Sequence, residues 1–338
     1  MGLMTINIWV TTKCNFNCIY CYEKKNIYEK KDMSYQIAND TAKFIVNFLA
    51  YKKISNCNIN FHGGEPLINN GIIWLIIEKL NQNKNCKYKF SMTTNGSLLN
   101  EDIIAKFLIK LDKISVSLDG NRDTFYKNRN NNISEVDFKH IIQNTILMQS
   151  KGINTVVRMT LRPEQVSLFF ENIKFFINLG LVKIDYALDI QNSIWNMGLL
   201  DDLLKQIRRV RKYIKDYNLK ADIDGIEPEI LHECGICQGG ISNLNIDIDG
   251  NIYPCVFATR NNQFVIGNIY NGIDSGWFFK LKMINNIEMK ACKGCNFLPC
   301  CMGKKCKIFN YILTGDYGLT SENVCLLQNF KYNLSKII

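Results

Sequence analysis

The chain has 338 residues, 47% of them apolar and 21% charged, which is ordinary for a globular protein with a packed core. No apolar run approaches the roughly 18 residues that span a membrane, and the start lacks a secretion signal, so we expect a cytoplasmic protein with no membrane partner. The formal net charge of +10 does not predict nucleic-acid binding, because lysines and acids are interspersed and the basic run at 208–212 stands alone.

Short β-like runs alternate with helical patterns from residue 5 to about residue 190. Strands are predicted at 6–11, 57–62, 88–94, 113–119, 154–161 and 181–188. Helices are predicted at 34–51 and 71–80, after the N-cap Asn100, at 136–150 and after Pro163. This alternation predicts an α/β fold with a parallel sheet and right-handed crossovers, either open or closed into a barrel or part-barrel.

The character of the chain changes in its last third. A helix predicted at 199–218 leads into a segment beyond residue 225 in which cysteines and turn residues are dense. Alternating apolar residues around Asp249-Gly250 predict a hairpin within 243–256.

Unusual residues follow the first four predicted strands. The sequences are TTKC (11–14), GGEP (63–66), TTNG (93–96) and SLDG (117–120). Because the carboxyl ends of parallel strands meet at one edge of a sheet, we expect these residues to share one site.

Fourteen cysteines in a cytoplasmic chain indicate metal or redox chemistry rather than disulfides. Cys14, Cys18 and Cys21 are close together in the sequence, Cys57 and Cys86 are isolated, and nine more lie between 234 and 325. Three thiolates on a four-iron cube leave one iron open to a substrate or cofactor, as at an open catalytic zinc.

The pattern of Cys14, Cys18, Tyr20 and Cys21, taken with the strand ends, resembles the radical S-adenosylmethionine enzymes. The resemblance implies a partial (β/α)6 TIM-like barrel in which the open iron binds S-adenosylmethionine. It also implies cofactor contacts by Tyr20, by Gly63, Gly64 and Glu65 of GGEP, by Asn95, by Ser117 at the ribose, and by Arg129 near the cofactor carboxylate.

The C-terminal cysteines resemble the SPASM extension of radical enzymes that act on peptides and proteins. The resemblance implies two auxiliary [4Fe–4S] clusters, and hence three clusters in all. One would be held by Cys234, Cys237, Cys255 and Cys306, and the other by Cys292, Cys295, Cys301 and Cys325. It also implies domain limits of 1–195 for the barrel, 196–224 for a helical connector and 225–338 for a small cysteine-rich iron–sulfur domain.

The spacing departs from the SPASM pattern at the adjacent pair Cys300 and Cys301. Either can be the ligand, and the other is then a spare thiol or, for Cys300, a candidate hydrogen-atom donor. Taken alone, the paired cysteines are also typical of zinc sites.

The resemblance implies reductive cleavage of S-adenosylmethionine to a 5′-deoxyadenosyl radical, which removes a hydrogen atom from a residue of a ribosomally made peptide or protein. The product would be a thioether or carbon–carbon crosslink, or an epimer. The partners implied are a peptide or protein substrate and an electron donor such as flavodoxin or ferredoxin. Because no peptide-binding domain fits before Cys14, we expect any leader peptide to be recognised by the barrel rim, by the extension or by a separate leader-peptide-binding protein.

Other functions remain open. Oxidation of Ser or Cys to formylglycine, as in anaerobic sulfatase maturation, is an alternative, although Val256 stands where those relatives typically carry an acid. An electron-transfer iron–sulfur protein and a zinc-stabilised nucleic-acid-binding protein are alternatives of other classes.

Overall fold

The computed structural model describes residues 3–25, 29–106, 110–129, 135–227 and 231–336. These residues form two compact units, each assembled from separate stretches of the chain. The first unit draws on 1–116, 130–155 and 238–281, and the second on 117–129, 156–237 and 282–338. The predicted domain limits at 195 and 225 stay a prediction.

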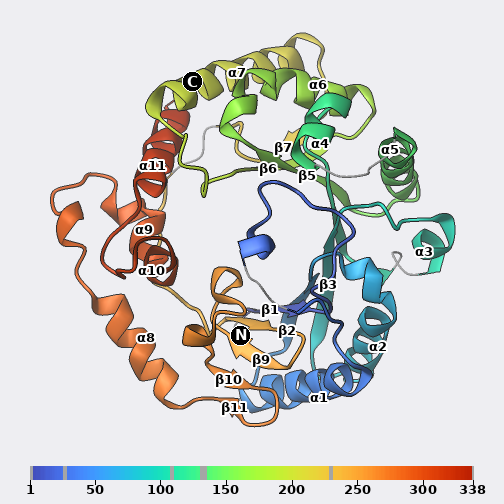
Figure 1. The fold of residues 1–338 in the computed structure, drawn as a ribbon, viewed down its shortest axis with the longest axis vertical. Coiled ribbons are helices and arrows are strands. Elements are labelled where there is room, and N and C mark those ends of the chain that lie inside the picture. Colours follow the sequence, from blue (N-terminus) through green and yellow to red (C-terminus); the bar gives the residue numbers. More distant parts are fainter. Residues whose placement is uncertain (1–2, 26–28, 107–109, 130–134, 228–230, 337–338) are drawn as a thin grey trace. The chain divides into compact units, whose positions relative to one another are not determined.

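The first unit is built on a sheet with the strand order β11-β10-β9-β8-β1-β2-β3-β4 (Figure 1). Strand β1 pairs in parallel with both β2 and β8, and β3 pairs in parallel with β2 and β4. The strands are β1 (Leu3–Trp9), β2 (Asn56–His62), β3 (Lys87–Thr94), β4 (Lys113–Ser117), β8 (Asn243–Ile246), β9 (Asn251–Tyr253), β10 (Gly267–Asn268) and β11 (Gly272–Ile273).

Strand β1 lies in the middle of this sheet and is buried along most of its length. Met4, Ile6 and Ile8 are fully buried, and the intervening Asn7 is only 4% exposed. Asn7 is tolerated there because its amide donates to Asn245 Oδ1 at 2.8 Å and its carbonyl accepts from Asn60 Nδ2 at 2.8 Å. The neighbouring strands therefore fix the register of β1 through a polar ladder within the core.

The helices of the first unit follow the predicted apolar spacing. Helix α1 begins after Ser34, whose hydroxyl accepts from Ile37 N at 3.2 Å, and it lies beside α2 (Figure 1). The predicted N-cap Asn100 is confirmed by its bond from Ile103 N at 2.8 Å. The helices are α1 (Tyr35–Tyr51), α2 (Asn70–Asn81), α3 (Glu101–Lys106), α5 (Glu135–Ser150) and the start of α8 (Gly276–Asn286).

The predicted hairpin is confirmed as β8 and β9, which pair antiparallel. The buried carboxylate of Asp247 holds the turn, since it accepts from the backbone N–H of Asp249 and of Asn251, each at 2.9 Å. Tyr253 donates its hydroxyl to the same carboxylate at 2.9 Å. The sequence did not predict that β8 also pairs with β1.

The second unit holds three parallel strands in the order β5-β6-β7. The six strands predicted between residues 6 and 188 are thus all present as β1–β6, each within a few residues of its predicted limits. The second-unit strands are β5 (Thr155–Leu161), β6 (Lys183–Leu188) and β7 (Asp222–Ile223).

Helices cover much of the second unit. The helix predicted at 199–218 is confirmed as α7, capped by Asn196, whose amide oxygen accepts from Leu199 N at 3.1 Å, and its role as a connector stays a prediction. The helix expected after Pro163 begins as a 3-10 turn and becomes α-helical at Phe169. The helices are α4 (Arg122–Arg129), α6 (Phe169–Asn178), α7 (Met197–Asp216), α9 (Met302–Lys305), α10 (Lys307–Thr314) and α11 (Glu322–Ser335).

The C-terminal helix α11 packs on α7 (Figure 1). Asn323 fixes this contact, because its amide donates to the carbonyls of Ile190 and Asn192, each at 2.8 Å. The C-terminal helices α10 and α11 were not predicted, since the cysteines and turn residues before them led us to expect loops in this segment. In the described part of the chain, no helix combines the length and the apolar character needed to cross a membrane.

Asn172 on α6 fixes the start of α4, and this contact gives a test of the fold. Its fully buried side chain accepts from Asn121 N at 3.0 Å and from the hydroxyl of Thr124 at 3.1 Å. We expect Asn172→Ala to lower the free energy of unfolding by about 1–3 kcal/mol, because two buried donors lose their acceptor. Anaerobic urea denaturation measures the loss.

The matched control is Asn178→Ala on the same helix. Asn178 is exposed and accepts one bond, from the Tyr213 hydroxyl at 3.1 Å. Its loss should change the unfolding free energy by no more than about 0.5 kcal/mol. Equal losses in the two variants would contradict the assignment of Asn172.

Candidate functional site

The three N-terminal cysteines lie in the loop that follows β1. The loop closes on itself where Cys21 N donates to Cys18 O at 3.2 Å, and it ends in the 3-10 helix η1 (Tyr22–Lys25). All three thiols are partly buried, and so is Tyr20 between them. The loop therefore presents its thiols at the carboxyl end of β1, as predicted.

The GGEP turn packs directly on this loop. Gly64 N donates to Thr11 O at 3.0 Å, and Glu65 N donates to Lys13 O at 2.8 Å. A Cβ atom added at Gly64 would lie 2.2 Å from Lys13 O and 2.9 Å from Cys14 Cβ, closer than atoms can approach. Glycine is required here so that the turn can contact the backbone of the cysteine loop.

The carboxylate of Glu65 is fully buried at the ends of β2 and β3. One oxygen accepts from Leu67 N at 3.1 Å and from the Thr94 hydroxyl at 2.7 Å. The other accepts from Asn95 N at 2.6 Å. The sequence predicted a cofactor contact for Glu65, and the structure adds that its carboxylate joins GGEP to TTNG.

Asn95 connects TTNG to the cysteine loop. Its amide donates to Asn15 Oδ1 at 2.9 Å and lies 4.0 Å from the sulfur of Cys14. Its carbonyl accepts from Ser97 N at 2.9 Å, which fixes the orientation of the side chain. The strand ends of β1, β2 and β3 are thus brought together, as the sequence predicted.

The electrostatics of the loop suit a bound cationic centre. Burial, together with the charges of Glu65, Cys18 and Cys21, raises the pKa of Cys14 to about 11. Each thiolate therefore disfavours ionisation of the neighbouring thiols unless positive charge lies between them. Iron ions supply that charge, so the donor set fits an iron–sulfur cluster.

A group that the sequence analysis did not identify adjoins this loop. Arg260 is 6% exposed and its guanidinium forms an ion pair with Glu23, two residues past Cys21. The same carboxylate accepts from Trp9 Nε1 at 3.1 Å. Burial lowers the pKa of Arg260, while Tyr22 and Cys21 act in the opposite direction. Its one signal in the sequence is an arginine five residues past Cys255.

The remaining predicted cofactor residues lie in the second unit. Ser117 is partly buried at the end of β4. Arg129 is 2% exposed and pairs with the fully buried Asp119, with Nε 3.1 Å and Nη2 3.3 Å from its two carboxylate oxygens. Asp119 also accepts from Thr160 N at 3.1 Å, so β5 anchors the pair.

Four C-terminal cysteines of one predicted cluster influence one another electrostatically. Burial raises the pKa of Cys325, and the thiols of Cys292, Cys301 and Cys295 raise it further. Cys325 lies on α11, Cys292 ends the 3-10 helix Lys290–Cys292, and Cys301 caps α9. All four cysteines belong to the second unit, and their assignment to one auxiliary cluster stays a prediction.

Three cysteines of the other predicted set also gather in the second unit. Burial, together with the charges of Cys237, Cys234 and Cys301, raises the pKa of Cys306 to about 11. The thiol of Cys234 donates to Cys301 O at 3.0 Å. The fourth predicted ligand, Cys255, lies in the first unit, just after β9.

The adjacent thiols of Cys300 and Cys301 differ in their surroundings. Cys301 is 7% exposed and acts on the pKa of Cys292, Cys306 and Cys325. The Cys300 sulfur instead lies 3.3 Å from Phe297 O and 3.5 Å from Gln328 Nε2. Cys57 and Cys86, which were assigned no ligand role, are both buried.

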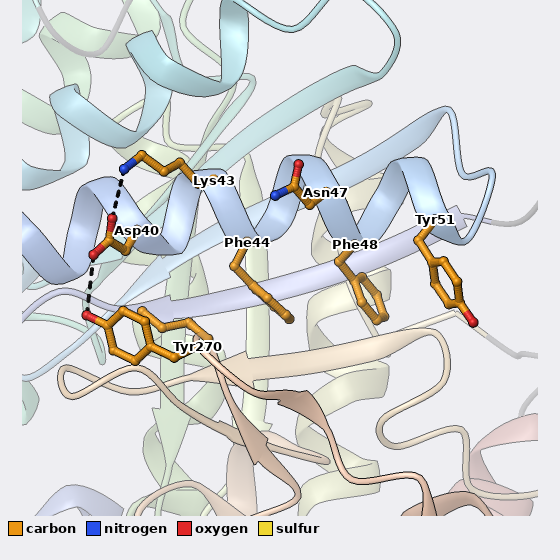
Figure 2. Close-up of a pocket in the computed structure, with 8 residues that line it drawn as sticks. Asp40, Lys43, Phe44, Asn47, Phe48, Tyr51 and Tyr270 are labelled. Carbon is orange, nitrogen blue, oxygen red and sulfur yellow. Dashed lines mark hydrogen bonds and ion pairs between the residues drawn. The ribbon is translucent and has the colours of Figure 1, made fainter.

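Outside the predicted site, the described residues offer no site for a single metal ion, and one groove lies beside α1. Among the described residues, no three Cys, His, Asp or Glu side chains converge closely enough to hold a single metal ion. A groove of about 510 Å³ lies beside α1, where Asp40 contacts Lys43 and Tyr270, and Phe44, Phe48 and Tyr51 project from the helix (Figure 2). The residues lining it include none of the predicted site residues.

Two family models match the chain. The model of the radical SAM superfamily matches residues 8–177, which is half of the chain. The SPASM model, described as an iron–sulfur cluster-binding domain, matches residues 237–296.

Relatives of several kinds are similar over most of the chain. An uncharacterized protein of Methanocaldococcus jannaschii is 28% identical, over 79% of this chain and 89% of its own. A probable GTP 3′,8-cyclase of Methanococcus aeolicus is 25% identical, over 85% and 96%. A cysteine-type anaerobic sulfatase-maturating enzyme of Clostridium novyi is 27% identical, over 86% and 84%.

Solved structures share the fold. Native anSMEcpe with bound AdoMet and a Cp18Cys peptide has a TM-score of 0.77 at 18% identity, over 99% of this chain and 97% of that chain. Streptococcus suis SuiB bound to its precursor peptide SuiA has a TM-score of 0.69 at 16% identity, over 96% and 76%.

These matches confirm the predicted fold class, an α/β fold with a parallel sheet and a C-terminal SPASM region. The predicted cofactors, S-adenosylmethionine and three [4Fe–4S] clusters, match the family pattern. The chain belongs to the radical SAM superfamily of enzymes.

Proposed function

We propose that the chain is a radical S-adenosylmethionine enzyme that modifies a residue of a ribosomally made peptide or protein. The observation that carries this proposal is the joining of Cys14, Glu65 and Asn95 at one sheet edge, in a chain that also has a SPASM region. The peptides named with anSMEcpe and SuiB support a peptide substrate. A crosslink or an epimer is the product we expect.

When bound, the N-terminal cluster and S-adenosylmethionine supply a 5′-deoxyadenosyl radical that removes a hydrogen atom from a C–H bond. The protein contributes orientation, electrostatics and the exclusion of competing reactions. Cys14, Cys18 and Cys21 would bind the cluster, and the buried Glu65 and Asn95 would hold their loop against β2 and β3.

Several residues remain proposed cofactor contacts, in part through their backbone. In GGEP the carboxylate of Glu65 is already satisfied by three donors within the protein. The turn would therefore contact S-adenosylmethionine through backbone groups, and Glu65 would act as a positioning residue. The other proposed contacts are Tyr20, Gly63, Gly64, Asn95, Ser117 and Arg129.

For Arg129 the structure supports a positioned cation. Asp119 holds two of its guanidinium nitrogens, and the ring of Phe125 lies 5.1 Å from Cζ. A buried guanidinium fixed in this way stays ionised and keeps one orientation, which suits recognition of a carboxylate.

We propose Cys234, Cys237, Cys255 and Cys306 as ligands of one auxiliary cluster. Cys292, Cys295, Cys301 and Cys325 would hold the other, and Cys301 is favoured over Cys300 because it acts on the pKa of its proposed partners Cys292 and Cys325. Cys300 remains a candidate hydrogen-atom donor, and flavodoxin or ferredoxin a candidate electron donor.

A second candidate is formylglycine formation, favoured by the similarity to the Clostridium novyi enzyme. Val256 weighs against it, because a valine beside Cys255 offers no carboxylate to accept a substrate proton.

The proposed function is tested by incubating the anaerobically reconstituted enzyme with dithionite, S-adenosylmethionine and candidate peptides. We expect 5′-deoxyadenosine together with a peptide that has lost about two hydrogens, or one that takes up deuterium without a change of mass in ordinary water. Mass spectrometry measures both. The control is a Cys14→Ala, Cys18→Ala, Cys21→Ala triple variant, and turnover of GTP with no peptide change would contradict the proposal.

The positioning role of Glu65 is tested by Glu65→Gln. The amide nitrogen would face N–H and O–H donors, so we expect about 1–3 kcal/mol lower stability and less iron at the N-terminal site. Urea denaturation and iron analysis after anaerobic reconstitution measure the two effects. Glu78→Gln, at an exposed position on α2, is the control and should match the parent protein.

The ligand assignment is tested by comparing Cys301→Ala with Cys300→Ala. Loss of a ligand weakens cluster binding, so Cys301→Ala should lower the bound iron by about 4 per chain. Cys300→Ala should retain full iron content, and the reverse order would assign the ligand to Cys300. Iron and sulfide analysis of anaerobically prepared protein gives the counts.

A further inference from the structure

A buried ion pair adjoins the loop that carries the three N-terminal cysteines. Glu23 lies two residues past Cys21, and its side chain is 14% exposed. One carboxylate oxygen accepts from Trp9 Nε1 at 3.1 Å, and the other pairs with Arg260. Trp9 ends β1, so the pair is attached to the strand that leads into the loop.

Arg260 reaches this position from the other end of the sequence. It lies in the turn between the 3-10 helices Val256–Ala258 and Asn262–Phe264, just after β9. Its φ of 63° is in the left-handed region, which is unfavourable for a residue with a Cβ. An unfavourable backbone conformation at a buried arginine is consistent with a side chain held by its partners.

The charges of the pair lie close to the cysteine loop. Arg260 interacts electrostatically with both Cys21 and Tyr22. Both members are largely buried, so water screens them less than it would a surface pair. A cluster gains negative charge when it is reduced, so a buried cation nearby stabilises the reduced form and a buried anion the oxidised form.

We propose that Arg260 and Glu23 are positioning residues that set the reduction potential of the N-terminal cluster. The inference rests on the proposed binding of that cluster by Cys14, Cys18 and Cys21. The guanidinium of Arg260 favours uptake of an electron by the cluster. The carboxylate of Glu23 holds this guanidinium in place and partly offsets its effect on the reduction potential. The segment that follows Cys255 thereby controls how readily the N-terminal cluster is reduced.

The test measures the potential of the cluster in the full, reconstituted chain. One electron passes from a dithionite-poised mediator to the cluster, no bond is made or broken, and EPR follows the reduced form. The N-terminal cluster is identified as the component that changes on addition of S-adenosylmethionine and is missing in the triple cysteine variant. This readout needs no peptide substrate, so it separates failure of this inference from failure of the proposed function.

Opposite shifts are expected from the two halves of the pair. Arg260→Gln should lower the ratio of reduced to oxidised cluster at a fixed potential by about tenfold, which is a shift of about 59 mV to more negative values. Glu23→Gln should raise the ratio, since the amide oxygen can still accept from Trp9 while the negative charge is gone. The double variant should lie between the two, and Arg260→Lys should lie nearer the parent protein than Arg260→Gln.

A purely structural role would not move the potential in opposite directions. Lys43→Ala, which removes a cation paired with Asp40 on α1, is the control for total charge and should leave the potential unchanged. If Arg260→Gln fails to retain iron, Glu23→Gln alone decides the question. Unchanged potentials, or shifts of the same sign in both variants, would overturn the inference.

Discussion

The buried carboxylate of Glu65 is the contact on which the site in the first unit depends. It accepts from donors in the turn after β2 and at the end of β3, while its own backbone N–H donates to the loop after β1. A buried carboxylate is costly unless its oxygens are satisfied, so the three strand ends have one favourable arrangement relative to one another. The close approach of Gly64 to Lys13 then leaves the cysteine loop no room to shift toward β2.

The second constraint is that the C-terminal part of the chain completes the first unit. Strand β8 pairs with β1, and the following turn places Arg260 against Glu23. The SPASM match covers this same segment. Residues that belong to the cluster-binding extension in sequence therefore take part in the core that supports the N-terminal loop.

Much of this arrangement could be predicted from sequence. The strands before Cys14, GGEP, TTNG and SLDG follow from β-branched and apolar runs, and the edge they share follows from parallel pairing. The hairpin around Asp249-Gly250 follows from turn chemistry. The three N-terminal cysteines, the family and its cofactors could be predicted because few other proteins combine this cysteine spacing with such strand ends.

Other features could not be predicted because their partners are distant in sequence. Asn172 and Asn121 are 51 residues apart, and Arg260 and Glu23 are 237 residues apart, with nothing local to pair them. The sequence analysis predicted a cofactor contact for Glu65, but the three donors to its carboxylate come together only because β2 and β3 lie side by side. Helices α10 and α11 were not predicted, although α10 has no cysteine and α11 has only Cys325, because the dense cysteines before them led us to expect turns throughout this segment.

The pairing of β1 with β8 has a consequence for the order of events during synthesis. The first strand emerges from the ribosome long before its neighbour at Asn243–Ile246 has been translated. Contacts between residues so far apart form slowly, because a long loop must close before they are made. The surroundings of the Cys14 loop are therefore complete only once β8 and the turn that carries Arg260 have been translated.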